Sequence, residues 1–126
     1  MKQVTGIGGI FFKAKDPDKL REWYRRHLGI ESENWGGFAF QWSDDPKTDG
    51  GTTVWTVFPD TTKYFAPSDK PFMINFRVAD LRSLLAQLRA EGVEAKSEES
   101  EFGKFGWIMD PEGNRVELWE PPAPTK

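Results

Sequence analysis

The chain has 126 residues, a mass of 14.4 kDa and a formal net charge of −3, with 17 Lys and Arg against 20 Asp and Glu. This length suits one domain, and the mildly acidic balance gives no support to nucleic-acid binding. The absence of cysteine removes disulfides, thiolate metal sites and thiol nucleophiles. No apolar run approaches the roughly 18 residues of a membrane span, and the Met-Lys-Gln start lacks a signal peptide's apolar core. We therefore expect a cytoplasmic protein that binds neither nucleic acid nor a membrane.

The N-terminal segment predicts a strand that leads into a helix. Residues 10–16, IFFKAKD, end at Asp16, which can cap the helix by accepting from the free amides of its first turn. Pro17 suits the first helical position, and Gly29 suits the left-handed residue that closes a helix. The apolar residues between them recur at helical spacing, at Leu20, Trp23, Tyr24 and Leu28.

Strand-like sequence and then a linker follow this helix. Phe40-Gln41-Trp42 precedes an Asp45-Pro46 turn, which opens into a final strand at 53–58. The next stretch, 59–71, reads PDTTKYFAPSDKP, and its three prolines predict a loop that crosses the sheet. Its aromatic pair, Tyr64 and Phe65, either covers the edge of the core or forms part of a lid.

The second half of the chain repeats the first. Ile74-Asn75-Phe76-Arg77-Val78-Ala79-Asp80 matches residues 10–16 at a distance of 64 positions. A second helix follows, with Leu81, Leu84, Leu85 and Leu88 on one face and Gly92 at its end. The acidic run 96–101, KSEESE, is expected to be a solvated loop. We predict a single domain, 1–126, made of two strand-helix-strands modules at about 4–58 and 72–121, with a linker at 59–71 and a tail at 122–126.

The last strand places a carboxylate away from the core. Asp110 to Asn114 reads as a tight turn, and the strand that follows alternates from Arg115 to Trp119. Val116 and Leu118 fall on one side and Glu117 on the other, because successive strand residues face opposite ways. Glu117 could therefore bind a metal, bind a ligand, or face water.

Two stretches, IFFKAKDPDKLREWYRRHLGI and FGWIMDPEGNRVELWEP, resemble the vicinal oxygen chelate superfamily of glyoxalase I, extradiol dioxygenases, fosfomycin-resistance transferases and bleomycin-resistance proteins. The resemblance covers roughly residues 4 to 121. It implies an α+β fold in which two tandem βαβββ modules form a curved mixed sheet that encloses a cup, the glyoxalase/bleomycin-resistance fold. It also implies a homodimer. Metal enzymes of the superfamily take ligands from the first and last strands of both modules, and Glu117 matches one ligand position.

The other three matching positions lack suitable donors. The repeat assigns them to Gly9, Trp55 and Met73. Glycine and tryptophan side chains offer no ligand atom, and the thioether of Met73 suits soft copper. The single histidine, His27, lies at a helix C-terminus, where the macrodipole favours a cation. We therefore expect no metal and no other cofactor, with a divalent metal as the alternative.

Strand alternation predicts which side chains share the face of Glu117. They are Gly9, Phe11, Lys13, Met73, Asn75 and Arg77 from the first strands and Thr53, Trp55, Val57, Arg115 and Trp119 from the last strands. Trp42 and Trp107 are added by the repeat. The expected ligand-binding residues are Phe11, Trp42, Trp55, Met73, Asn75, Arg77, Trp107, Glu117 and Trp119. In the alternative interpretation these aromatics pack between the modules, and Glu117 pairs with Arg77 or Lys13.

These residues leave more than one function open. The favoured hypothesis is a small-molecule binding protein of the bleomycin-resistance type, which holds an aromatic or cationic compound without a catalytic metal. The alternative is a glyoxalase-like lyase or isomerase, or a dioxygenase-family enzyme, with Glu117 as a general base or a metal ligand. A structural dimer module is a third possibility.

Overall fold

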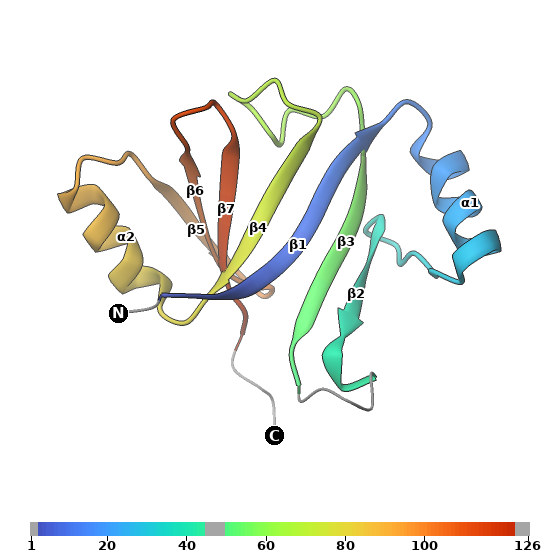
Figure 1. The fold of residues 1–126 in the computed structure, drawn as a ribbon, viewed down its shortest axis with the longest axis horizontal. Helices are drawn as coiled ribbons and strands as arrows, with labels where there is room; N and C mark the ends of the chain where they lie inside the picture. The colour runs from blue at the N-terminus through green and yellow to red at the C-terminus, as the bar shows by residue number, and fades with distance from the viewer. Residues whose placement is uncertain (1–2, 45–49, 123–126) are drawn as a thin grey trace.

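The structure is a computed structural model that describes residues 3–44 and 50–122 (Figure 1). The described residues form seven strands, two α-helices and one short 3-10 helix. The strands are β1 (Val4–Ala14), β2 (Gly37–Gln41), β3 (Thr52–Pro59), β4 (Phe72–Val78), β5 (Lys96–Ser100), β6 (Gly103–Met109) and β7 (Arg115–Glu120). The helices are α1 (Pro17–Leu28), α2 (Leu81–Ala90) and η1 (Trp42–Asp44). The expected Asp45-Pro46 turn and most of the predicted tail lie outside the described residues.

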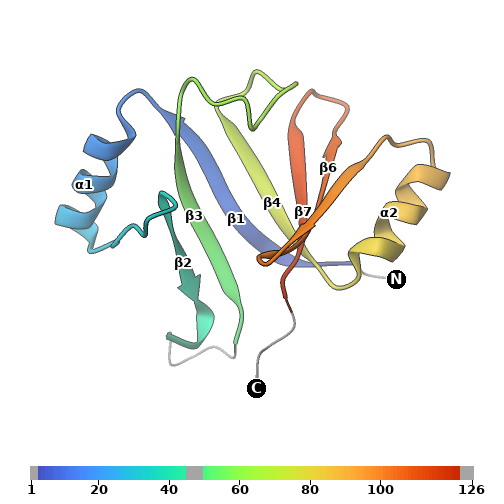
Figure 2. The ribbon, with the colours of Figure 1, turned by 180° about the vertical axis from the view of Figure 1, so that it is seen from behind.

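One mixed sheet contains all seven strands, in the order β2-β3-β1-β4-β7-β6-β5. The two halves of the chain join where β1 pairs antiparallel with β4, and within each half the first strand pairs in parallel with the last. In Figures 1 and 2 the sheet is an open curve with α1 and α2 on its outer flanks. The predicted α+β fold, with its curved mixed sheet, is confirmed.

The first half of the chain contributes three strands instead of four. Residues 29–36, GIESENWG, follow α1 but form no strand. The amide of Gly36 bonds the carbonyl of Glu33, and the amide of Glu33 bonds the carbonyl of Gly37, so this segment turns back on itself. In the second half the corresponding place is taken by β5, which is the acidic run that had been expected to be a loop. All five residues of β5 are exposed, so the solvation was predicted correctly and the conformation was not.

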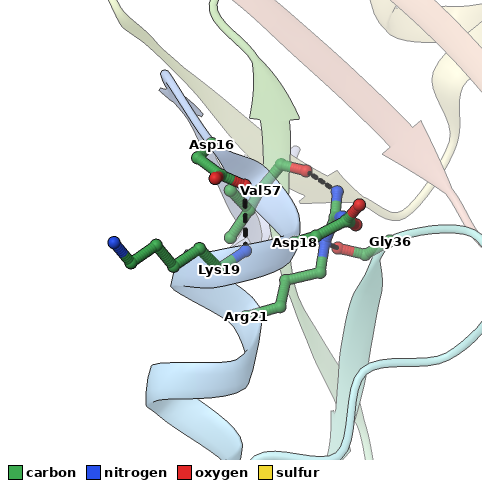
Figure 3. Close-up of polar contacts among 6 residues, drawn as sticks. All are labelled: Asp16, Asp18, Lys19, Arg21, Gly36 and Val57. Atoms are coloured by element: carbon green, nitrogen blue, oxygen red, sulfur yellow. Dashed lines mark hydrogen bonds and ion pairs between the residues drawn. The ribbon is translucent and has the colours of Figure 1, made fainter.

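The helices form where their capping residues predict. Asp16 accepts a 3.1 Å hydrogen bond from the amide of Lys19 at the start of α1 (Figure 3). Arg21, on the inner side of α1, donates to the carbonyl oxygens of Gly36 at 2.9 Å and Val57 at 2.5 Å. These two bonds attach α1 to β3 and to the turn before β2. Neither helix in the described ranges is long and apolar enough to cross a membrane, and the cytoplasmic location stays a prediction.

Each side of the sheet has its own apolar cluster. The cluster under α2 consists of Val78, Leu81, Leu84, Leu85 and Leu118. On the opposite side, which we call the concave face, Phe11 and Met73 pack with Phe65. Phe65 belongs to the segment between β3 and β4 and is 0% exposed. This segment is therefore bound to the sheet by a fully buried side chain.

Candidate functional site

Glu117, in the middle of β7, is the centre of a buried polar cluster. Only 1% of this residue is exposed, and its carboxylate accepts hydrogen bonds from three side chains. Asn75 donates its Nδ2–H to Oε1 at 2.6 Å, while Tyr64 donates its hydroxyl at 2.5 Å and Trp107 its Nε1–H at 2.7 Å to Oε2. Three such charge-assisted bonds offset much of the cost of removing a carboxylate from water.

The strand register explains why these side chains meet. Asn75 on β4 pairs with Glu117 in the parallel ladder, and Trp107 on β6 pairs with Glu117 in the antiparallel ladder. Paired strand residues project to the same face, so the three side chains form one row across three strands. Tyr64 comes from the segment between β3 and β4, which in Figure 2 lies near the turn between β6 and β7.

Gly8 on β1 makes room for Asn75. A Cβ atom at Gly8 would lie 2.0 Å from Asn75 Oδ1 and 3.1 Å from Cε3 of Trp119. Asn75 is 2% exposed, and its Oδ1 has no hydrogen-bond partner among the described residues. The carboxamide is thus held by its bond to Glu117 on one side and by the bare backbone of Gly8 on the other.

A row of aromatic rings continues from this cluster. The Phe105 ring stacks on Trp107, with centroids 6.2 Å apart and an interplanar angle of 9°, and on Trp119 at 6.3 Å and 17°. We call these three side chains the aromatic row. Arg115 lies at the Trp107 end, with its guanidinium 5.2 Å from the Trp107 ring centroid and 5.6 Å from that of Tyr64. Its Nη1–H also donates to the Tyr64 carbonyl.

The surroundings alter the ionisation of two of these groups. Burial raises the pKa of the Tyr64 phenol well above its ordinary value, and the negative charge and hydrogen bond of Glu117 raise it further. The phenol therefore keeps its proton and remains a donor at neutral pH. Burial lowers the pKa of Arg115, while Tyr64 and Glu117 raise it.

Several predicted site residues lie together on the concave face. Asn75 and Trp107 contact Glu117 directly, and Arg77 pairs in register with Trp119 one row further along β7. Phe11 and Met73 belong to the apolar cluster beneath Phe65, so they support the site from within the core. The predicted pairing of Glu117 with Lys13 or Arg77 is not among the ion pairs of the described residues.

Trp42 lies at the other end of the sheet. It donates its indole N–H to Thr53 Oγ1 at 2.8 Å, its ring occupies the place of a Cβ atom on Gly51, and its Cη2 would lie 3.5 Å from a Cβ atom on Gly6. These contacts place it beside β1 and β3, whereas Glu117 receives its donors from β4, β6 and the segment between β3 and β4.

The placement of Trp55 on the concave face is wrong. Its ring packs against Tyr24 of α1, with centroids 4.9 Å apart, and against Phe12 at 5.9 Å, so it lies on the helix side of the sheet. Thr53 and Val57 are two residues away from Trp55 on the same strand, so they share its face, and the same mistake assigned them to the concave face. The concave residues of β3 are Val54, Thr56 and Phe58; Val54 and Phe58 pack on the Phe65 cluster.

The mistake is a one-residue shift between the two halves. Phe11 and Asn75 are equivalent in the repeat, and they pair with Thr56 and Glu117 respectively. The counterpart of Glu117 is therefore Thr56. The sequence analysis aligned Trp55 with Glu117, because Val54-Trp55-Thr56 resembles Val116-Glu117-Leu118. The strand register does not follow this alignment.

Two functional candidates were missed by the sequence analysis. Phe105 forms the middle of the aromatic row, and its position two residues before Trp107 on one strand was a usable signal. Tyr64 was assigned to a cover or a lid, but no pattern in the sequence indicated that its hydroxyl would bond Glu117. Its partner Phe65 fits the interpretation as a cover of the core.

The donor set around Glu117 does not fit a catalytic metal in this arrangement. Within residues 3–44 and 50–122, no group of three or more His, Cys, Asp or Glu side chains is placed to hold a metal ion. The two oxygens of Glu117 already accept three hydrogen bonds, and its neighbours in the row are an amide and an indole.

Two hollows in the described surface lie on the helix side, away from Glu117. One, of about 320 Å³, lies between α2 and the β5–β6 hairpin and includes Arg82, Arg89 and Phe105 in its lining. The other, of about 490 Å³, lies at the start of α1 beside Lys15 and Trp23. Neither hollow contains the polar cluster.

A curved mixed sheet with helices on its outer flanks and a polar cluster on its concave face is the architecture of the glyoxalase/bleomycin-resistance fold. A family model described as Glyoxalase-like domain matches residues 9–119, so the chain belongs to this family. The predicted resemblance to the vicinal oxygen chelate superfamily is thereby confirmed. No curated protein matches the sequence.

Solved structures with the same fold include methylmalonyl-CoA epimerases. The Mycobacterium tuberculosis enzyme is 20% identical, with a TM-score of 0.63 over 98% of this chain and 92% of that chain. A variant of the Streptomyces coelicolor enzyme in complex with 2-nitronate-propionyl-CoA is 21% identical, with a TM-score of 0.66 over 95% and 99%. An NAD-dependent benzaldehyde dehydrogenase structure from Legionella pneumophila matches at 14% identity and a TM-score of 0.59, over 90% and 98%. At these identities the similarity shows the fold alone.

The expectation that the protein uses no cofactor is wrong in the light of these comparisons. The epimerases that share the fold are metal-dependent enzymes. The sequence argument counted ligand types at four positions, one of which, Trp55, lies on the other face of the sheet. It therefore gave no sound basis for excluding a metal.

Proposed function

We propose that this chain binds a small organic molecule on its concave face, against the aromatic row and beside Arg115. The observation that supports the proposal is the arrangement around Glu117, where donors from three separate segments hold one buried carboxylate. Replacing a buried charge by an apolar side chain of similar volume is often neutral or stabilising. A buried carboxylate that fixes Tyr64, Asn75 and Trp107 in place is therefore better explained by the positioning of a binding surface than by stability.

The side chains around the cluster favour a planar ligand. Trp107, Phe105 and Trp119 are only partly buried, and their stacked rings offer apolar surface, while both indole N–H groups already donate, to Glu117 and to the Phe102 carbonyl. Of the two ligand types expected from the sequence, an aromatic compound is better supported than a cationic one. Arg115 already lies over the rings of Tyr64 and Trp107, which a ligand cation would need.

Titration with planar compounds tests the proposal. We expect saturable binding of naphthalene derivatives, followed by equilibrium dialysis, and a loss of about tenfold in affinity when Trp119→Leu removes one ring of the row. Trp23→Leu is the matched control, because Trp23 is 51% exposed on α1, outside the concave face. Equal affinities of both variants and the parent protein would remove the aromatic row from the site.

An enzyme of the epimerase type is the second candidate. The observation in its favour is the set of solved structures with this fold, which includes a methylmalonyl-CoA epimerase in complex with methylmalonyl-CoA and NH4+. Against it, the oxygens of Glu117 that a general base would use already accept from three donors. Exchange of the α-proton of methylmalonyl-CoA in deuterated water, followed by mass spectrometry, separates the two. If the parent protein catalyses exchange and Glu117→Gln abolishes it, the enzyme is favoured. If the parent protein catalyses no exchange, the binding function remains the better proposal.

We also propose a homodimer, as the superfamily resemblance implies. Ile10 and Phe72 support it, because they lie on the helix side of β1 and β4 and are 39% and 40% exposed. Apolar side chains at the centre of a sheet are normally covered. Sedimentation equilibrium of the Ile10→Lys variant should show a shift from dimer to monomer, and a parent protein that sediments as a monomer would end this proposal.

A further inference from the structure

The cations of the concave face form no ion pair with a carboxylate of the described residues. Elsewhere in the described residues four cations form ion pairs, Arg21 with Asp18, Arg25 with Glu22, Arg82 with Glu99 and Lys104 with Glu120, and most of the remaining cations are exposed to water. On the concave face Lys13, Arg77 and Arg115 are each partly buried, and none of them forms an ion pair with a described residue. The chain is acidic overall, so its concave face differs in charge from the rest of the molecule.

Arg115 is the cation best placed to meet a ligand. It lies at the end of the aromatic row, above the Trp107 ring, and its one hydrogen bond among the described residues goes to the Tyr64 carbonyl. A guanidinium has five N–H donors, so most of them remain free. Partly buried charges are normally paired, because losing water without a partner is costly.

Glu117 does not fill this role. It lies two residues from Arg115 on the same face of β7, yet its oxygens are taken by Tyr64, Asn75 and Trp107. It is also 1% exposed, so it contributes little direct contact to a ligand lying on the face. The exposed side of the cluster therefore presents Arg115 and the rings.

We propose that the ligand of the concave face carries an anionic group, a carboxylate or a phosphate, which Arg115 binds while the planar part lies on the aromatic row. The planar fork of the guanidinium matches either anion with two parallel hydrogen bonds. Arg77, in register with Trp119 at the other end of the row, adds a second positive charge. This inference rests on the proposed binding function and specifies its ligand class.

A series with one ring system and different charges tests the inference. The compounds are 2-naphthoate, 2-naphthyl phosphate, 2-naphthamide and 2-naphthamidine, and binding is measured by equilibrium dialysis at 20 mM and 300 mM NaCl. We expect at least one anion to bind about tenfold or more tightly than the amide, with the amidine weakest. The preference should shrink at high salt, because salt screens partly exposed charges. The tighter anion identifies carboxylate or phosphate as the group recognised.

Variants locate the effect at Arg115. Arg115→Gln should reduce the affinity for the preferred anion to about that of the amide. Arg115→Lys keeps the charge without the fork and should give an intermediate loss, which also controls for any displacement of Tyr64. Arg26→Gln, on the exposed side of α1, is the matched control.

Two outcomes overturn the inference in different ways. If the amide or the amidine binds the parent protein as tightly as both anions, the ligand class is wrong and the binding function stands. If none of the four compounds binds, the proposed function fails and this inference fails with it.

Discussion

The bond between Asn75 and Glu117 predicts a specific pattern of destabilisation and rescue. Asn75→Asp would place a second carboxyl 2.6 Å from that of Glu117, with both groups buried. Two buried carboxylates at that distance do not both ionise, so the folded state has to keep a proton. Holding it at pH 7, about three units above an ordinary carboxyl pKa, costs about 4 kcal/mol. This is a large part of the roughly 5–15 kcal/mol that stabilises a typical domain.

The pH dependence has a definite sign. In the Asn75→Asp variant the shared proton has a raised pKa in the folded state, so the variant approaches the parent protein in stability below about pH 4 and loses stability as the pH rises. Urea denaturation between pH 4.5 and 7.5, followed by tryptophan fluorescence, measures this slope.

The double variant Asn75→Asp with Glu117→Gln provides the control. This variant exchanges the positions of the amide and the carboxylate, so the pair still has one donor and one acceptor. It should therefore regain about 2 kcal/mol or more of the stability that Asn75→Asp loses at pH 7. An Asn75→Asp variant within about 1 kcal/mol of the parent at pH 7, with no pH slope, would refute the reasoning.

Three further substitutions test the surroundings of this pair. Tyr64→Phe should lower stability by about 1.5–3 kcal/mol, because a hydrogen bond to a charged group is lost. It should also remove the fall in stability above about pH 10, where the unfolded phenol ionises before the folded one, whose pKa is raised; urea midpoints from pH 8 to 11 measure both effects. Gly8→Ala should cost about 1–3 kcal/mol in thermal or urea unfolding, because its Cβ meets a buried carboxamide. Gly50→Ala, with open space around it, should cost under about 1 kcal/mol. Phe65→Ala should lower the free energy of unfolding by about 3–5 kcal/mol, because it removes a fully buried ring. Phe102→Ala, at a residue that is 64% exposed, should leave it nearly unchanged, and scanning calorimetry of both variants measures the difference.

Local features of the fold could be predicted from the sequence. Asp16 caps α1, and the left-handed Gly29 ends it, because capping depends on residues within one turn. The orientation of Glu117 away from the α2 core also followed correctly from alternation within one strand. These predictions needed no knowledge of the rest of the chain.

Features that depend on distant segments were harder to predict. Trp55 was assigned to the wrong face because a shift of one residue between two strands reverses every side chain. The acidic run of β5 lacks the apolar alternation of a strand, since it lies at the edge of the sheet with every residue exposed. The contact of Tyr64 with Glu117 depends on how the segment 59–71 lies on the sheet, which local turn residues do not determine.

The antiparallel pairing of β1 with β4 has a consequence for how the molecule responds to a broken backbone. Because this pairing joins the two repeated halves at the middle of the sheet, separating them would expose an unpaired strand on each half and remove Met73 from the cluster of Phe11 and Phe65. If the chain is produced as two separate fragments divided at the exposed Ala66–Pro67 step, the fragments should therefore associate without a covalent link.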